Sequence, residues 1–420
     1  MLNILVETKV ANIYEIFKKV HESSMKLSLC MIVKNEEATL PKSLSSVKNV
    51  VDEMVVLDTG STDRTPEIAK KFGAQVHHFE WCNDFSAARN EALKYVTGDW
   101  ILVLDADETL TQKIVPQLQQ AIRREEYLLI NLLRHEVGAE QSPYSLVSRL
   151  FRNHPEIRFS RPYHALVDDS VSEILTQEPH WQVGYLEGVG IVHTGYQKSA
   201  IAQQDKFPKA QAAMEEFFAS HPHDPYVCSK LGALYVESGK LVEGIKLLAQ
   251  GVAHCEEEYE TLYELYYHLG IAYSRLQNYK NAIAHYDAAV KLPIYPILKL
   301  GAYNNLGNLL KASGDFNGAK TAYETTIKID PSFAIGYYNL GMTLKEMGLF
   351  KDAILAYRKA IELNPKSAET YQNLGVLLLK LGYVQDSLMT FKKAIALHEQ
   401  QNPKEAKRLR QSLEEMGLLR

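Results

Sequence analysis

Two aspartates at the end of an apolar run are the residues in this chain whose spacing points most directly to chemistry. In the segment GDWILVLDADETL, residues 98–110, the apolar run leads into Asp105 and Asp107, with one alanine between them. Side chains two residues apart on an extended chain point the same way, so both carboxylates can share one divalent cation. Without a cation they would repel each other. The segment therefore predicts a cation site.

Two classes of enzyme use such a pair. In phosphoaspartyl phosphatases, whose motif reads Asp-x-Asp-x-Thr, the first aspartate is a nucleophile; in nucleotide-sugar enzymes, the pair and its cation hold a diphosphate. The phosphatase motif lies on the first strand of its core, whereas three strand-like segments precede Asp105 here. A phosphatase also needs a later lysine and an acidic motif, for which VDDS at 167–170 is a weak candidate. The order of the segments favours the diphosphate clamp.

The elements that must position this pair alternate along the first 200 residues. Strands are expected at 27–33, from 53 into a Gly-Ser-Thr turn before 63, at 74–79 and at 99–105, with helices between them. This order indicates right-handed βαβ units and a mainly parallel sheet. Ligands of such sheets lie at the carboxyl ends of the strands. The polar residues expected at that edge are Asn35, Glu36, Asp58 and Asp105.

A periodic helical pattern takes over near residue 200. Leu-Gly pairs begin at residues 231, 269, 306, 340 and 374, and the last three are 34 residues apart. That period is the signature of tetratricopeptide repeats, which are helical hairpins stacked into a solenoid. In the repeat at 334–365, Gly341 is small enough to admit the second helix closely, and Pro365 ends that helix. We expect about five repeats over 223–400 and a capping helix over 401–420.

Three asparagines recur at the same position of successive repeats. Asn305, Asn339 and Asn373 each precede a Leu-Gly pair, which places them in line on the first helices. An amide both donates to and accepts from a peptide backbone, so such a ladder can bind extended polypeptide. It resembles the asparagine ladder in the repeats of the nucleocytoplasmic N-acetylglucosamine transferase of proteins. Asparagines that only pack between repeats are the alternative.

Composition excludes other classes of function. The formal net charge is −5 and no long basic run appears, so a nucleic-acid partner is not expected. The four cysteines lie far apart without metal-ligand spacing, as in a reducing cytoplasm. No apolar run approaches the roughly 20 residues of a membrane span. We expect a cytoplasmic protein without a transmembrane segment, whose amphipathic residues 1–24 form a helical extension that packs on the next domain or rests on a membrane surface.

Four motifs give the first 200 residues a resemblance to a known family. SLCMIVKNEEATL, VVLDTGSTDRT, FSAARNEAL and GDWILVLDADE occur in the order and approximate spacing of a glycosyltransferase family 2 domain. They most resemble the branch with an opening CMIVKNE motif, which is often fused to tetratricopeptide repeats. The resemblance implies an α/β domain of the Rossmann-like GT-A fold over 25–197, a helical linker over 198–222, and then the all-α solenoid.

The resemblance also implies a donor and a metal. The donor would be a nucleotide-diphosphate sugar, with a UDP-sugar expected, and Mn²⁺ or Mg²⁺ would neutralise the departing diphosphate. Asp107 would hold the metal, while Asp105 would share it or bind the ribose. His193 resembles the late histidine that supplies a third metal ligand, although a histidine hydrogen-bonded in a domain seam is the alternative.

Contacts to the nucleotide follow from the same resemblance. Glu36 and Asp58 are implied to contact the nucleoside, and the guanidinium of Arg89 to pair with phosphate or base. Asp58 and Asp63 could instead cap the helix that begins near Thr65, and Arg89 could be a surface charge. The full set of expected nucleotide-sugar residues is Asn35, Glu36, Asp58, Arg89 and Asp105.

The sequence does not identify the general base that would take the proton of the acceptor. Family 2 enzymes generally invert the anomeric centre by direct displacement, which needs a general base. The branch usually has His-Glu where this chain has His164-Ala165. The candidate bases are therefore Glu108, Asp168 and Asp169, with the last two preferred, while His164 could orient the acceptor.

Three functions remain open at this stage. The first is an inverting glycosyltransferase whose repeats recruit a protein or peptide acceptor or partner. The second is a transferase acting on a glycan or lipid-linked acceptor, and the third is a repeat scaffold with a weakly active or sensor-like transferase domain. Because Asp105 and Asp107 are both present, the two transferases are favoured over the scaffold.

Overall fold

The structure is a computed structural model of the 420-residue chain, and it describes residues 25–139, 141–163, 165–194, 211–256 and 258–418. The expected N-terminal helix at 1–24, most of the expected linker and His164 lie outside these ranges. The chain divides into two compact units, which are described separately. Unit 1 comprises Met1–Gly138 and Tyr144–Lys206, and unit 2 comprises Ala139–Pro143 and Phe207–Arg420.

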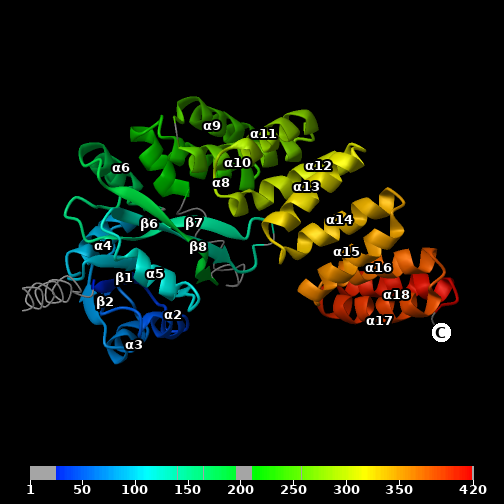
Figure 1. Cartoon of the computed structure of the whole chain (residues 1–420), viewed down its shortest axis with the longest axis horizontal. Coiled ribbons are helices and arrows are strands. Elements are labelled where there is room, and N and C mark those ends of the chain that lie inside the picture. The colour runs from blue at the N-terminus through cyan, green and yellow to red at the C-terminus, as the bar shows by residue number, and fades with distance from the viewer. Residues whose placement is uncertain (1–24, 140, 164, 195–210, 257, 419–420) are drawn as a thin grey trace, which may run out of the picture. The chain divides into compact units, whose positions relative to one another are not determined.

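Unit 1 is built on one mixed sheet of eight strands in the order β3-β2-β1-β4-β7-β6-β8-β5 (Figure 1). The strands are β1 (Leu27–Val33), β2 (Glu53–Asp58), β3 (Gln75–His78), β4 (Trp100–Val103), β5 (Glu108–Leu110), β6 (Tyr127–Glu136), β7 (Tyr144–Arg152) and β8 (Gln182–His193). The first four are parallel, as predicted. Beyond β4 the pairing becomes mixed, because β7 is antiparallel to both β4 and β6.

Helices cover both faces of the sheet. They are α2 (Leu40–Val47), α3 (Thr65–Lys71), α4 (Phe85–Leu93), α5 (Val115–Ala121) and α6 (Asp168–Gln177). Alternate side chains of a strand point to opposite faces, so Leu29 and Met31 of β1 join one core with α2, α3 and α5. Cys30 points the other way and joins a second core with α4 and α6. The predicted α/β fold class is confirmed.

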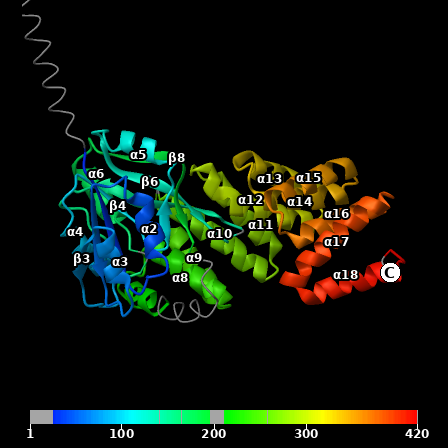
Figure 2. The ribbon, with the colours of Figure 1, turned by 90° about the horizontal axis from the view of Figure 1, so that it is seen from below.

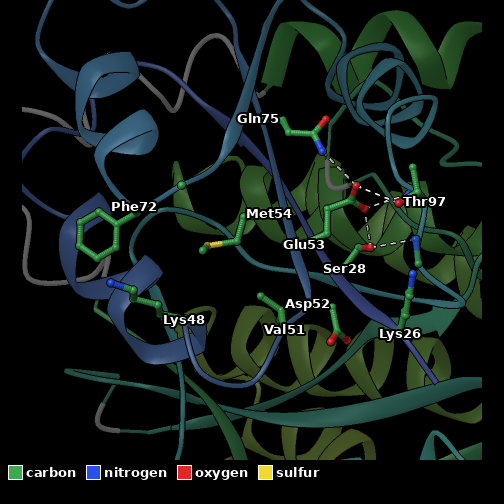
Figure 3. A pocket seen from close by; sticks show the side chains of 12 residues that line it. Lys26, Ser28, Lys48, Val51, Asp52, Glu53, Met54, Phe72, Gln75 and Thr97 are labelled. Carbon is green, nitrogen blue, oxygen red and sulfur yellow. Dashed lines mark hydrogen bonds between the residues drawn. The ribbon is translucent and has the colours of Figure 1, made fainter. Parts of the chain in front are cut away.

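One cavity of about 540 Å³ lies at the amino-terminal ends of β1 and β2 (Figure 3). Glu53 accepts hydrogen bonds there from Ser28, Gln75 and Thr97. Burial would raise the pKa of Glu53, but the hydrogen bonds from Ser28 and Thr97 outweigh it and lower that pKa. The carboxylate is thus bonded to residues on three strands or turns and fastens them together. This cavity lies at the end of the strands opposite to Asp58 and Asp105.

Unit 2 is all-α. Residues 211–220 are helical, and ten helices follow in five hairpin pairs before a last helix. They are α8 (Pro225–Glu237), α9 (Leu241–His254), α10 (Tyr259–Arg275), α11 (Tyr279–Lys291), α12 (Leu300–Ala312), α13 (Phe316–Ile329), α14 (Ala334–Glu346), α15 (Phe350–Leu363), α16 (Ala368–Lys380), α17 (Val384–Gln401) and α18 (Pro403–Glu415). Figure 2 shows these hairpins stacked one after another along the chain. None of the helices in the described ranges combines the length and apolar character that crossing a bilayer requires.

The glycine of each Leu-Gly pair sits where two helices of a hairpin touch. A Cβ added at Gly341 would lie 2.8 Å from the ring of Tyr357, which is closer than real Cβ atoms approach. Gly307 meets Tyr323 at 2.7 Å in the same way. The small residue therefore lets the buried aromatic ring of the second helix lie against the backbone of the first.

Candidate active site

The predicted nucleotide-sugar residues converge on one edge of the sheet. Asp58 is the last residue of β2, Asn35 follows β1 by two residues, and Asp105 follows β4 by two residues. Because β1 pairs in parallel with both β2 and β4, the three strands end at the same edge. The sheet thus places these side chains together, although they are up to 70 positions apart in the sequence.

Asp105 is held by two arginines. Its Oδ1 accepts a hydrogen bond from Arg89 Nη2 at 2.6 Å, and its Oδ2 accepts one from Arg149 Nη2 at 3.0 Å. Burial would raise the pKa of Asp105, but the charges of Arg149 and Arg89 hold it well below its usual range. Arg89, on α4, is 7% exposed and is not a surface charge. Since both oxygens of Asp105 are engaged, Asp105 is the weaker candidate to share a cation.

Asp107 and His193 form the better candidate for a cation site. His193 Nε2 lies 3.4 Å from Asp107 Oδ2, and His193 Nδ1 lies 2.5 Å from Glu136 Oε2. Two ligand atoms bonded to one octahedral cation at about 2.1 Å lie roughly 3 Å apart, so the observed separation fits a shared cation. A carboxylate on the second ring nitrogen is the usual support of a metal-binding histidine. Strand pairing sets this geometry, because β8 brings His193 opposite Glu108 of β5 and Glu136 of β6.

The two carboxylates beside His193 favour the protonated, positively charged form of its imidazole ring. Burial would lower the pKa of His193, but its hydrogen bonds to Asp107 and Glu136 raise it to about 9. No group of three or more His, Cys, Asp and Glu side chains in the described ranges could hold a metal by itself. Donor oxygens or water would therefore have to complete the coordination of any cation at Asp107 and His193.

Glu108 has a structural position that rules against its expected role as a base. It is 0% exposed, and its Oε2 accepts the backbone N–H of Asp105 at 2.9 Å while its Oε1 accepts from Arg134 Nη1 at 2.8 Å. Arg134 Nε also donates to Glu136 Oε1 at 2.7 Å. Both oxygens of Glu108 are engaged away from solvent, so no acceptor hydroxyl can reach them. Glu108 instead fixes the turn that carries Asp105.

A β-bulge between β6 and β7 directs two polar side chains into the site. Ile130 pairs with Leu150, but Leu132 pairs with Val147, so one residue of β6 faces both Ser148 and Arg149 of β7. Val147 and Leu150 consequently pack in the same core, which regular alternation would forbid. The extra residue leaves Ser148 and Arg149 for polar contacts, with Asp168 and Asp105 respectively.

The two remaining candidate bases differ in their surroundings. Asp168 Oδ1 lies 2.7 Å from the Ser148 hydroxyl, its Oδ2 is buried without a hydrogen-bond partner, and burial raises the pKa of this carboxyl. Asp169 is 46% exposed and is paired with Arg161 at 2.8 Å and with the Ser160 hydroxyl. Arg161 itself has a left-handed φ of 74°, a strained conformation for a side chain of this size. Neither carboxylate is excluded by these contacts.

The residues expected at the nucleoside also organise their own loops. Asp58 is 2% exposed, accepts from the backbone N–H groups of Gly60 and Ser61, and lies 3.2 Å from His78 Nδ1. Asn35, at φ 55°, accepts the Thr62 N–H at 2.7 Å. Their nucleotide contacts remain predictions.

Glu36, Asp63 and Ala165 were also considered from the sequence, and each has its own local contacts. Glu36 accepts a hydrogen bond from the Thr39 hydroxyl. At the start of α3, the backbone N–H and the hydroxyl of Thr65 donate to Asp63, so of the two predicted caps Asp63 is the one that contacts this helix. Ala165, which stands where the branch has glutamate, packs partly buried against the second core.

The asparagine ladder pairs with its own neighbouring repeats. Asn339 is 6% exposed, and its Nδ2 donates to Asn304 Oδ1 at 2.8 Å. Asn373 Nδ2 donates to the hydroxyl of Tyr338 at 3.0 Å, one repeat earlier, and Asn305 Nδ2 donates to that of Tyr286 at 3.3 Å. The expectation of three amides presented alike to a peptide is wrong at Asn339, because that side chain is used in packing.

Three residues of the site are absent from the sequence-based expectation: Arg134, Glu136 and Arg149. The first two carried a signal, since a charged pair closes the otherwise apolar segment YLLINLLRHE. Arg149 carried none, because its direction depends on the bulge.

Comparisons with known proteins match both parts of the chain. A family model described as glycosyl transferase family 2 matches residues 28–184, and tetratricopeptide repeat models match segments within 263–389. A TPR repeat-containing protein of Synechococcus elongatus is 45% identical over 305 residues, covering 73% of this chain and 76% of the relative. The SPbeta prophage-derived glycosyltransferase SunS of Bacillus subtilis is 28% identical over 199 residues, and the chain spans only about half (46%) of its length. The solved structure of MamA from Desulfovibrio magneticus RS-1 aligns at 23% identity over 42% of this chain and 97% of MamA, with a TM-score of 0.38.

An α/β sheet with an Asp-x-Asp pair at its carboxyl edge, followed by helical hairpins, defines a GT-A glycosyltransferase domain joined to a repeat solenoid. The chain carries a glycosyl transferase family 2 domain over residues 28–184 and belongs with the tetratricopeptide repeat proteins through its C-terminal repeats.

Proposed function

We propose that the protein moves a sugar from a nucleotide-diphosphate sugar to an acceptor hydroxyl with inversion at the anomeric carbon. The observation that carries this proposal is the juxtaposition of Asp107 and His193, 3.4 Å apart, beside an Asp105 held by two arginines. A pair of cation ligands beside two guanidinium groups is what a diphosphate leaving group needs.

The donor end of the reaction depends on charge. Asp107 and His193 fit Mn²⁺ or Mg²⁺, which when bound would neutralise the negative charge that develops on the departing diphosphate. Glu136 holds the His193 ring so that Nε2 faces Asp107. We propose that Asp105, which is held by Arg89 and by the contact of Glu108 with its backbone, accepts a hydrogen bond from the ribose.

The acceptor end requires a base, and we assign that role to Asp168. In the reaction the acceptor oxygen forms a bond to the anomeric carbon, the bond from that carbon to the diphosphate oxygen breaks with its electron pair, and the acceptor proton passes to Asp168 Oδ2. Asp168 has no ion pair among the described residues, and burial raises its pKa, as suits a general base. Asp169 is neutralised by Arg161. Because Oδ2 is buried, the acceptor hydroxyl can reach it only after a change in the packing around Asp168.

In this proposal the repeats bind the acceptor or a partner protein. Solenoids of this kind bind along the face formed by their first helices. Asn305 and Asn373 lie partly exposed on those helices, whereas Asn339 is buried between repeats. We therefore propose that a protein or peptide binds along this face without relying on three equivalent amides.

A thermal-shift panel of nucleotide sugars with and without Mn²⁺ tests the proposal and identifies the donor. One nucleotide sugar should raise the unfolding temperature of the full-length protein in a Mn²⁺-dependent way, and Asp107→Ala should abolish that dependence. Asp386→Ala, a change in the first turn of α17, is the matched control and should retain it. Undiminished protection in Asp107→Ala would rule out the clamp. Protection without any product or free nucleotide over hours would favour the sensor-like alternative.

A further inference from the structure

Beside Asp105, a nitrogen of Arg149 has no hydrogen-bond partner in the described part of the chain. Arg149 Nη2 donates to Asp105 Oδ2 at 3.0 Å, but Arg149 Nη1 is buried and has no hydrogen-bond partner there. Leaving a buried N–H of a charged group without an acceptor is costly, so native proteins rarely do it without a functional reason. The Arg149 side chain is 13% exposed, which leaves little room for bulk water to satisfy it.

The charged groups around Arg149 balance one another, so the nature of the missing partner follows from hydrogen-bond chemistry. At Asp105, the guanidinium groups of Arg89 and Arg149 face a single carboxylate. Arg134 in turn pairs with two carboxylates, Glu108 and Glu136. A charged acceptor forms a shorter and stronger hydrogen bond with a guanidinium than a neutral acceptor does, and phosphate oxygens match its geometry. An anion is therefore the acceptor that suits Nη1 best.

The backbone around Arg149 is irregular at this point. The bulge inserts an additional residue into β7, and Arg149 and Ser148 both leave the core that Val147 and Leu150 fill. Bulges commonly redirect a side chain beside an active site. Here the redirected guanidinium lies against Asp105, two residues from Asp107 of the proposed cation site.

We propose that Arg149 is a donor-binding residue, whose Nη1 donates to a diphosphate oxygen of the bound nucleotide sugar while Nη2 remains on Asp105. This inference rests on the proposed function, because it takes the diphosphate as the anion. The planar guanidinium can serve two acceptors at once, which an ammonium group in the same place could not do with the same geometry. Arg149 thereby also stabilises the charge that appears on the diphosphate as the sugar leaves.

The competing explanation is that Arg149 only positions Asp105, and a double-mutant cycle on the full-length protein separates the two. UDP is titrated calorimetrically with Mn²⁺ into the wild type, Arg149→Met, Asp105→Asn and the double variant. If Arg149 binds phosphate, Arg149→Met weakens UDP binding by about 10- to 100-fold in the wild-type and in the Asp105→Asn background alike. If Arg149 acts only through Asp105, the second substitution changes nothing, and the inference is overturned.

Controls keep every outcome informative. Arg149→Lys retains the charge but loses the planar fork, and it should bind UDP more weakly than the wild type, with an unchanged unfolding midpoint. Arg158→Met removes an exposed arginine paired with Glu173 and should bind as the wild type does. If the wild type binds none of UDP, GDP, CDP and dTDP, the proposed function itself fails. Wild-type binding with full affinity in Arg149→Met overturns this inference alone.

Discussion

Removing Arg134 should destabilise unit 1 far more than removing an exposed arginine. Arg134 is ion-paired with Glu108, which is 0% exposed, and with Glu136, whose side chain is 8% exposed. Arg134→Met keeps most of the side-chain volume but leaves the buried Glu108 without its cation and leaves Glu136 with His193 alone. Breaking such a buried pair costs about 3–5 kcal/mol of unfolding free energy, since the uncompensated charge stays in the interior.

The assay can be confined to unit 1. All three tryptophans of the chain, Trp81, Trp100 and Trp181, lie in that unit, and the repeat helices contain none. Tryptophan emission during urea unfolding therefore reports unit 1 alone. With a slope of about 2 kcal/mol per M, the expected loss moves the midpoint down by roughly 1.5–2.5 M.

The rescue and the control make the prediction specific. Adding Glu108→Gln to Arg134→Met removes one unpaired charge and should recover part of the loss. Arg158→Met, which breaks an ion pair with both side chains more than half exposed, should cost less than about 1 kcal/mol. Equal midpoints for the two arginine variants, or no recovery with Glu108→Gln, would refute the account of this buried network.

The pH dependence of the Arg134→Met defect has a defined sign. In the wild type, burial would raise the pKa of Glu136, but the hydrogen bond from His193 and the charge of Arg134 outweigh it and lower that pKa. Without Arg134, protonation of the buried carboxylate relieves the cost. The deficit should therefore be larger at pH 8 than at pH 5, and a deficit that grows on acidification would contradict the reasoning.

Three further substitutions test other parts of the structure. Asp168→Asn should lower kcat by about 10²–10⁴-fold with unchanged donor affinity in a steady-state assay. Because burial raises the pKa of Asp168, the wild type should lose stability as the pH rises through that raised value, whereas Asp168→Asn should not; parallel urea curves from pH 4.5 to 8 would show otherwise. Gly341→Ala should destabilise the repeats by about 1–3 kcal/mol, because its Cβ would meet the Tyr357 ring at 2.8 Å. Asn339→Ala should cost about 1–3 kcal/mol by leaving Asn304 without its buried partner, seen by circular dichroism with tryptophan unfolding unchanged.

The parallel half of the sheet was predictable because its signals are local. Each of β1, β2 and β4 is a short apolar run followed by polar residues, and a parallel sheet brings such ends together. The arrangement of β5 to β8 was not, since those pairings join residues far apart in sequence: Glu108 meets His193 across 85 positions. Local pattern carries no information about which distant strand is the neighbour.

The residues of the site were likewise predictable only where their signal is local in the sequence. Asp105, Asp107 and Asp58 could be located because they lie at or just after the ends of predicted strands. The contacts of Glu108 and Arg149 could not be predicted, because they depend on the direction in which each side chain points. Glu108 is adjacent to the pair in sequence, yet it turns inward to Arg134. Arg149 points to Asp105 because a bulge breaks the alternation from which its direction would be read.

The cross-repeat amide bond has a consequence for how this solenoid can change in length. Asn304 and Asn339 are paired 35 residues apart, and Asn373 occupies the same position one repeat later. Loss of the 34 residues 334–367 would bring Asn373 opposite Asn304, where an amide already serves as the partner. A whole hairpin could thus be deleted or duplicated between these repeats while the buried contact is re-formed. The asparagines that pack neighbouring repeats together would therefore allow the number of repeats to change.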